Sequence, residues 1–574
     1  MASISGSCSV AGSERRRAAF RPALYSTGLV AGLAMCGVIA VATSGGPRFY
    51  PDDPLWTDDD TVVKVSAVVP TEDANSYDFA VNTFSTPGER RNVRALNVNT
   101  LDEVPDSSWF VNRIGRAPMS TAELVRGPDR YESISLEGWQ VSGSKTTGAQ
   151  PGFRMRDRDG HTYQVEVDPP SNPEMASGAE IIGTAFYHAF GYHTVDVYLT
   201  ELDPASLVIA ERADFRDPFV GERRRLARSD IDDVLRRAAR LKNGKYRVLV
   251  SRFADGQPLG NFRYYGTRPD DPNDVVAHEH RRELRAARVF GAWLNHDDSR
   301  GINSLDMLVE AQDRRYVKHY MFDFGSIMGS GTVYAQRHRA GNEYILEWKP
   351  GWLTLATLGA YTRPWMRISY PEVPRSVGRF EGEAFQPASW KPEYPNPAFD
   401  NMRPDDAFWA ARIISRFDAA AVRAIVGKAR YTDPAATEYV TQTLLRRREK
   451  ILKTWLTQVN PLVDFALSET GELTFASAAD QAGVAAPATS YRLQWARFDN
   501  TTGVATEVGG EVSADQPRVR APIDLIGANA TSEFVQVRVA AIHPAFASWA
   551  TPVTVHFRRA GSGWRLVGLN RLPE

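Results

Sequence analysis

The spacing of apolar residues predicts a mixed first part of the chain. Apolar and polar residues alternate over 139–142, 151–156, 162–167, 195–202 and 246–253, and each of these segments is expected to form a strand. Asp159-Gly160, between the second and third segments, predicts a hairpin turn. Apolar residues at helical spacing over 172–190, closed by Gly191, predict a helix. This order of hairpin, strand, helix and strands indicates an α+β lobe.

Helical spacing dominates the middle of the chain. Helices are expected at 222–245, 282–294, 405–414, 419–429 and 435–458, with short strands at 316–322 and 344–348. From about residue 475 alternation returns, and strands are expected at 491–498, 534–539, 553–557 and 564–569. The first pattern indicates a large helical lobe, and the second a small all-β sandwich or barrel.

These patterns predict four parts after an N-terminal segment of 46 residues. Residues 47–132 are expected to be an irregular lead-in that packs on the main domain. The main domain has a small lobe at 133–260 and a large lobe at 261–460, and a C-terminal β domain follows at 475–574. The expected fold class is therefore α+β, followed by an all-β domain.

The first 46 residues have the composition of an export signal. Arginines at 15–17 and 21 precede a nearly continuous apolar run over 23–41, and residues 40–42 fit a small-x-small cleavage site. An uncleaved membrane anchor through 23–41 is an equal alternative, because the run is almost long enough to span. Both alternatives place the body outside the cytoplasm, in the periplasm, at the cell surface or on the inner membrane.

The composition and the absence of several motifs exclude some classes of functional site. The only two cysteines, Cys8 and Cys36, lie in the N-terminal segment, so the body has no disulfide, thiolate nucleophile or cysteine-based zinc site. Lys and Arg (68) balance Asp and Glu (69), which gives no global field for nucleic acid. Phosphate-binding P-loop, H-E-x-x-H zinc and G-x-S-x-G hydrolase patterns are absent from the sequence.

The candidate chemistry is concentrated between residues 296 and 325. His296-Asp297-Asp298 is followed by Asn303, and a predicted strand then delivers Asp323 to a glycine-containing turn. Carboxylate and amide oxygens in this order suit a hard cation such as Mg²⁺. The expected helix and strand before these loops would hold them rigidly, as is common at active sites.

These motifs resemble those of the protein-kinase-like superfamily. His296-Asp297-Asp298 with Asn303 is similar to the catalytic pattern H-x-D-x-x-x-x-N, and Asp323-Phe324-Gly325 to the metal-binding D-F-G turn. The resemblance covers roughly 135–455 and is greatest to the atypical HipA-like, spore-coat and secretory-pathway kinases. It implies a two-lobed fold, ATP and Mg²⁺ (or Mn²⁺), Asp298 as catalytic residue, and Asn303 and Asp323 as metal ligands. Glu180 would lie on the small-lobe helix.

One position departs from that pattern. The third strand of such kinases carries a lysine that holds nucleotide phosphates, and here Glu166 stands at the corresponding place. Lys145, in a turn bounded by Gly143 and Gly148, could reach the phosphates instead. Two functions follow: an exported phosphotransferase with an unknown protein or small-molecule acceptor, or a catalytically impaired pseudokinase that acts as an envelope scaffold. Residues 104–110 and 390–399 also resemble an uncharacterised group of bacterial exported proteins.

Overall fold

The computed structural model describes residues 47–574, except 147, 218–220, 312, 528–531 and 574. The predicted signal or anchor at 1–46 lies outside the described residues. Among the helices that the structure describes, none is long and apolar enough to cross a membrane. The described chain is α+β, with several sheets and interspersed helices.

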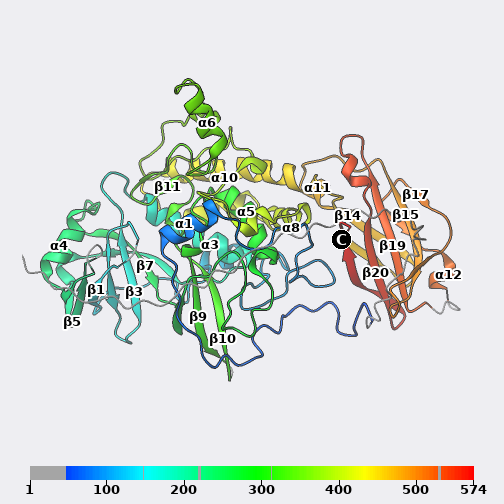
Figure 1. Cartoon of the computed structure of the whole chain (residues 1–574), viewed down its shortest axis with the longest axis horizontal. Coiled ribbons are helices and arrows are strands. Elements are labelled where there is room, and N and C mark those ends of the chain that lie inside the picture. Colours follow the sequence, from blue (N-terminus) through cyan, green and yellow to red (C-terminus); the bar gives the residue numbers. More distant parts are fainter. Residues whose placement is uncertain (1–46, 147, 218–220, 312, 528–531, 574) are drawn as a thin grey trace, which may run out of the picture. The chain divides into compact units, whose positions relative to one another are not determined.

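The first sheet carries the predicted small-lobe strands. Seven strands lie in the order β4-β7-β3-β2-β1-β5-β6 (Figure 1). All pairs are antiparallel except β1 with β5, which is parallel. The bounds are β1 Gln140–Ser144, β2 Gly152–Arg156, β3 Thr162–Val167, β4 Val197–Leu202, β5 Val208–Arg216, β6 Arg223–Arg225 and β7 Tyr246–Arg252. The five predicted strands are confirmed, and β5 and β6 extend the sheet beyond them.

Helix α3 (Met175–Phe190) is the predicted helix between β3 and β4, and every residue in it except His188 is buried. It ends at Gly191, whose φ of 134° favours glycine. A Cβ at Gly191 would lie 2.2 Å from the Phe110 ring, so glycine also permits close packing. Phe190 stacks on Phe290 with ring centroids 4.2 Å apart, which joins α3 to the helical part of the core.

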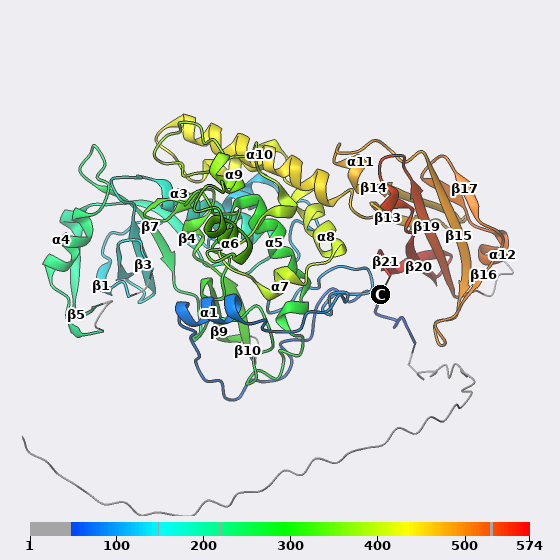
Figure 2. The ribbon, with the colours of Figure 1, turned by 45° about the horizontal axis from the view of Figure 1, so that its top comes forward.

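The helical part follows the predicted bounds closely. It contains α5 (Arg282–Leu294), α7 (Pro397–Asp400), α8 (Pro404–Ser415), α9 (Ala419–Gly427) and α10 (Pro434–Trp455), and α10 packs against α5, α8 and α9 (Figure 2). Trp409 and Phe417 lie in its core. A three-stranded sheet of β8 (Gln257–Gly260), β9 (Ser304–Ala311) and β10 (Arg314–Met321) leads from α5 to the expected metal turn.

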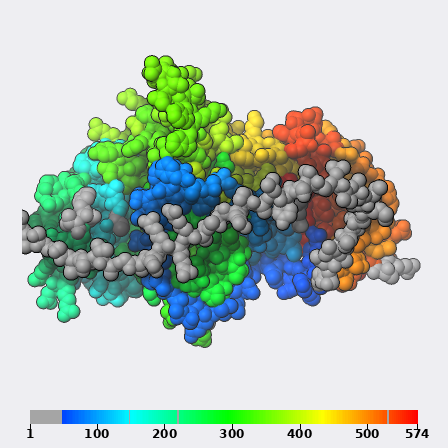
Figure 3. Space-filling view, in the orientation of Figure 1, coloured from blue at the N-terminus to red at the C-terminus, as the bar shows by residue number. Residues whose placement is uncertain are grey.

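Two predicted elements are wrong. The charged stretch 222–245 contains β6 and the shorter α4 (Arg228–Arg236) rather than one helix. The strand expected at 344–348 does not form, because in the described chain the only backbone hydrogen bond from this segment to a neighbouring one runs from the Ile345 N–H to the Glu393 carbonyl (2.7 Å). Helix α6 (Trp348–Ala356) begins there instead and projects at the upper edge in Figure 3, and none of its residues is buried. Residues 330–335 form the short hairpin β11 (Ser330–Gly331) and β12 (Tyr334–Ala335).

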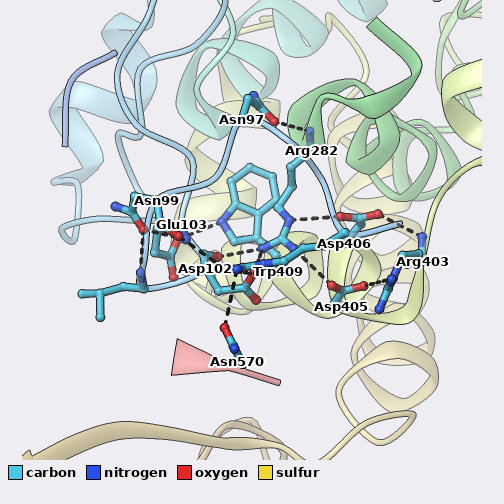
Figure 4. Close-up of polar contacts among 12 residues, drawn as sticks. Asn97, Asn99, Asp102, Glu103, Arg282, Arg403, Asp405, Asp406, Trp409 and Asn570 are labelled. Atoms are coloured by element: carbon cyan, nitrogen blue, oxygen red, sulfur yellow. Dashed lines mark hydrogen bonds and ion pairs between the residues drawn. The ribbon is translucent and has the colours of Figure 1, made fainter. Parts of the chain in front are cut away.

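The segment from 47 to 132 contains two helices, α1 (Asn75–Phe84) and α2 (Thr121–Arg126), in otherwise irregular chain. A buried charge network ties it to α5 and α8 (Figure 4). Arg282, with 0% of its side chain exposed, pairs with Asp102 (2.9 Å), Asp405 (3.3 Å) and Asp406 (3.0 Å). The Trp409 indole N–H donates to Glu103 (2.8 Å). The lead-in is therefore part of the structure that holds α5 in place.

Residues beyond α10 form two further sheets. One has the order β13-β14-β18, and the other β16-β15-β19-β20-β21 with β17 on β15. The bounds are β13 Leu462–Leu467, β14 Glu472–Ser477, β15 Ser490–Phe498, β16 Ala505–Glu507, β17 Val512–Ala514, β18 Arg518–Arg520, β19 Phe534–Ile542, β20 Val553–Ala560 and β21 Gly563–Asn570; short helices are α11 (Ala478–Gln481) and α12 (Ile523–Ile526). Residues 47–574 cluster as one compact unit, so a separate β domain from 475 stays a prediction.

Candidate functional site

The loop after α5 presents the predicted catalytic residue. Helix α5 ends at Asn295, which adopts a left-handed conformation (φ 52°) and turns the chain into the loop. The Asn303 side-chain amide donates to the backbone carbonyl of Asp298 (2.8 Å) and closes the loop. Arg300, two residues after Asp298, forms an ion pair with its carboxylate and a second with Glu393 (3.4 Å). The loop thus holds Asp298 from both its backbone and its side chain.

The environment of Asp298 favours a proton on its carboxyl group. Burial raises the pKa of Asp298 to about 7, against the opposing charge of Arg300 and with further repulsion from Glu393 and Asp323. A carboxyl group whose pKa lies near neutrality can exchange protons at physiological pH. The same repulsion shows that Asp298 and Asp323 lie within electrostatic range of each other.

The turn that carries Asp323 is packed against both α3 and the loop of Asp298. Asp323 has a positive φ (65°) and precedes the short helix η4 (Phe324–Ser326). The Phe324 ring stacks on Tyr187 of α3, with centroids 4.4 Å apart, and contacts the His296 ring at 5.6 Å. The Tyr187 hydroxyl and His296 Nδ1 are hydrogen bonded (2.7 Å). Three segments that are distant in sequence therefore share one buried junction.

Glu180 reaches this turn from α3. A Cβ on Gly325 would lie 3.7 Å from Glu180 Oε2, so the carboxylate sits against the turn backbone. Burial raises the pKa of Glu180 well above its usual value, and Asp323 and Glu166 raise it further. Burial and Glu166 also raise the pKa of Asp323, whereas Lys145 and Arg300 lower it. The three carboxylates thus form one mutually repelling cluster.

Lys145 lies beside the residue that replaces the expected lysine. Its ammonium forms an ion pair with Glu166 of β3 and donates to the Gln150 carbonyl (2.9 Å). Gly148 has a φ of 81°, and a Cβ there would lie 3.1 Å from Lys145 Nζ, so glycine lets the turn fold over the lysine. Since its charge lowers the pKa of Asp323, Lys145 lies within electrostatic range of the Asp323 turn.

Gly143 lies within β1, where packing gives a separate reason for glycine. A Cβ at this position would lie 2.4 Å from Arg154 Nη2 and 2.5 Å from Asp214 Oδ1. Arg154 and Asp214 form an ion pair (2.8 Å) across the neighbouring strands. A contact between Gly143 and a nucleotide therefore stays a prediction, as do the other assigned roles.

The motifs alone missed three residues of the site: Arg300, Glu393 and Tyr187. Arg300 had a local signal, since it is a lone basic residue two positions after Asp298. Glu393 lies 95 positions beyond Asp298, and the Glu393 N–H donates to the Asp297 carbonyl (2.7 Å), a contact that no spacing reveals. The spacing of apolar residues did not distinguish Tyr187 from the other core positions of its helix.

Comparison with known protein families finds no match, and no curated protein matches either. Among solved structures, a Helicobacter pylori proinflammatory kinase, CtkA, is similar at 12% sequence identity and a TM-score of 0.30, over 55% of this chain and 95% of that one. A likeness this distant carries no statement about the activity or substrate of this chain.

Proposed function

We propose that this chain is a kinase-like protein that binds ATP together with Mg²⁺ or Mn²⁺ and transfers a phosphoryl group to a hydroxyl-bearing acceptor. One observation carries the proposal: Tyr187, Phe324 and His296 join α3, the Asp323 turn and the Asp298 loop at one buried junction. Chance occurrences of two short motifs would not be expected to meet in this way.

The charge of the carboxylate cluster supports a divalent cation nearby. Asp323, Glu180 and Glu166 repel one another in a buried setting, and a bound cation would relieve that repulsion. Asp323 and Asn303 are the proposed ligands, since they supply carboxylate and amide oxygens. When bound, the cation would neutralise charge on the nucleotide phosphates.

The remaining roles belong to two cations and one carboxylate. The charges of Lys145 and Arg300 both lower the pKa of Asp323, and we assign these two groups to the phosphate oxygens. Asp298 would accept the proton of the acceptor hydroxyl, for which its raised pKa is suited. Lys145 must leave or share its contact with Glu166 to reach a phosphate.

Titration calorimetry of the purified chain with ATP, with and without Mg²⁺ or Mn²⁺, tests this proposal. We expect metal-dependent binding that Asp323→Ala abolishes. Lys145→Met should weaken nucleotide binding by roughly tenfold or more, as expected for a lost charged hydrogen bond. Lys245→Met, which removes an exposed lysine paired with Glu201, is the matched control. Full nucleotide affinity in Lys145→Met, or no binding with either metal, would refute the assignment.

The second candidate is a catalytically impaired scaffold, and the Lys145–Glu166 pair favours it. A lysine held by a carboxylate offers the phosphates less net charge than a free one. The scaffold reading predicts metal or nucleotide binding without phosphoryl transfer or ATP hydrolysis. Measuring release of the γ-phosphate in the same samples separates the two candidates.

Export, and anchoring through 23–41, are part of the same proposal. The basic residues before that apolar run support it. Fractionation of cells that express the tagged chain, with protease added from outside, would contradict it if the body stayed protected in the cytoplasm.

A further inference from the structure

A polar cavity lies away from the carboxylate cluster. It has a volume of about 180 Å³ and is lined by the end of α3, the chain that follows it, the end of β7 and one face of β10. None of the residues proposed to hold a nucleotide or a metal lines it. The volume is well above the space that a single water needs.

Two of the four cations that line this cavity are already paired with carboxylates. Arg130 bridges Asp196 (3.1 Å) and Asp255 (2.6 Å), and Arg252 also pairs with Asp255 (2.9 Å). The two carboxylates that line the cavity are therefore neutralised by the two arginines beside them.

The other two cations in the lining have no carboxylate partner within the described chain. Arg113 donates to the backbone carbonyls of His188 (2.8 Å) and Tyr192 (3.1 Å). Lys318, on β10, places its ammonium 5.2 Å from the Tyr320 ring centroid, and no ion pair joins it to any described residue. The cavity thus has an excess of two positive charges.

Burial and mutual repulsion destabilise the charged forms of Lys318 and Arg113. Burial lowers the pKa of Lys318, and Arg113 and Arg130 lower it further. Burial lowers the pKa of Arg113 to about 10. The pKa of His193, another lining residue, is also lowered by burial and by Lys318 and Arg113, which leaves its ring neutral. An anion in the cavity would offset all of these effects.

Thr194 supplies an independent sign of a ligand. It lines the cavity, is only 8% exposed, and its hydroxyl has no hydrogen-bond partner among the described residues. A buried hydroxyl without a partner costs about 1–3 kcal/mol, so such groups normally find one. The hydroxyl oxygen is shielded from solvent, so the side chain would have to turn toward the cavity to donate to a phosphate oxygen.

We propose that this cavity is an anion site that binds the phosphoryl group of a small molecule, held by Arg113, Lys318 and the Thr194 hydroxyl. Free phosphate and a phosphate monoester share this chemistry, and the size of the cavity leaves room for a short ester group. The inference stands independently of the proposed phosphotransfer, because none of the residues assigned to that reaction takes part.

Titration calorimetry of the whole chain without divalent cations tests the site. The probes are inorganic phosphate, glycerol 3-phosphate and, as an anion without a phosphoryl group, chloride at matched ionic strength. We expect saturable binding of a phosphoryl probe, tighter for the ester if that is the natural ligand class. Lys318→Met should weaken it at least about tenfold, and the nearly isosteric Thr194→Val about threefold to tenfold.

Two controls keep the result specific. Lys349→Met removes an exposed lysine of α6 and should leave the affinity unchanged, as should Lys145→Met at the proposed nucleotide site. Circular dichroism checks the fold of each variant, and Thr194→Val decides the question if Lys318→Met does not fold. Absence of saturable binding below about 10 mM, unchanged affinity in the folded variants, or loss of binding in Lys145→Met would overturn the proposal.

Discussion

Asp298 should make the folded chain less stable as the pH rises from 5 to 8. Burial raises the pKa of this carboxyl from 3.8 to about 7, and Arg300 only partly opposes the rise. Between these two values the folded state keeps the proton and the unfolded state has released it. The unfolded state therefore binds fewer protons, so the free energy of unfolding falls as the pH rises through this window and levels off above it.

The size of the effect follows from the shift. The rise in the pKa of Asp298 from 3.8 to about 7 corresponds to about 4 kcal/mol of unfolding free energy in total. Of this, about 3 kcal/mol is lost between pH 5 and pH 8. The Asp298 side chain is 14% exposed, so solvent screens little of this cost. Asp298→Asn keeps the shape of the side chain but cannot ionise. Arg300 retains Glu393 as a partner in that variant.

Urea unfolding of the wild type and Asp298→Asn at pH 5 and pH 8 measures the difference. The variant should gain about 3 kcal/mol relative to the wild type when the pH is raised from 5 to 8. Asp232→Asn, which removes an exposed carboxylate paired with Arg228, should keep the pH dependence of the wild type. Equal pH dependence in the wild type and Asp298→Asn would show that Asp298 is not held in the buried environment described here.

Two further predictions concern the scaffold of the site. Arg282→Met should cost about 3–5 kcal/mol of unfolding free energy, because it leaves buried carboxylates without their partner; Arg236→Met, at a 72% exposed arginine, should change it by less than about 0.5 kcal/mol. Trp390→Ala should lower the free energy of unfolding by about 3–5 kcal/mol, since Trp390 is 1% exposed and its indole N–H donates to Asn295 (3.1 Å). Trp352→Ala, at a tryptophan that is 63% exposed, should lower it by less than about 0.5 kcal/mol. Denaturant unfolding of each pair decides both, and equal losses within a pair would contradict the burial argument.

The elements that sequence periodicity predicted are those that bury a large share of their residues. Strand β3 alternates between partly exposed and buried residues, and α5 buries nearly all of its length, so their patterns are strong. Strand β5 was missed because it lies near the edge of its sheet and most of its residues stay accessible. The strand wrongly predicted at 344–348 has the apolar residues of a strand but, among the described residues, only one backbone hydrogen bond to a neighbouring segment. In both segments the presence or absence of a neighbouring strand to pair with, rather than local composition, determined whether a strand formed.

In the candidate site, too, some residues could be selected from the sequence and some contacts could not. Asp298, Asn303 and Asp323 belong to short motifs with fixed spacing, so the sequence was enough to select them. The contact between Lys145 and Glu166 depends on how the turn after β1 folds over β3, and the sequence analysis did not predict it. Nothing in the sequence indicated that Glu393 lies beside Arg300, because the two are joined only by the tertiary fold.

The balance of charge favours metal binding as the more basic property of the site. Glu166, Glu180, Asp298 and Asp323 influence one another there, and Glu393 adds to the repulsion at Asp298, against the two cations Lys145 and Arg300. Negative charge is therefore in excess when these groups are ionised, and a divalent cation would offset it. An additional nucleotide would bring its own negative charge, so it needs that cation first. Both candidate functions therefore share a metal-dependent first step, and they separate only at the transfer of the phosphoryl group.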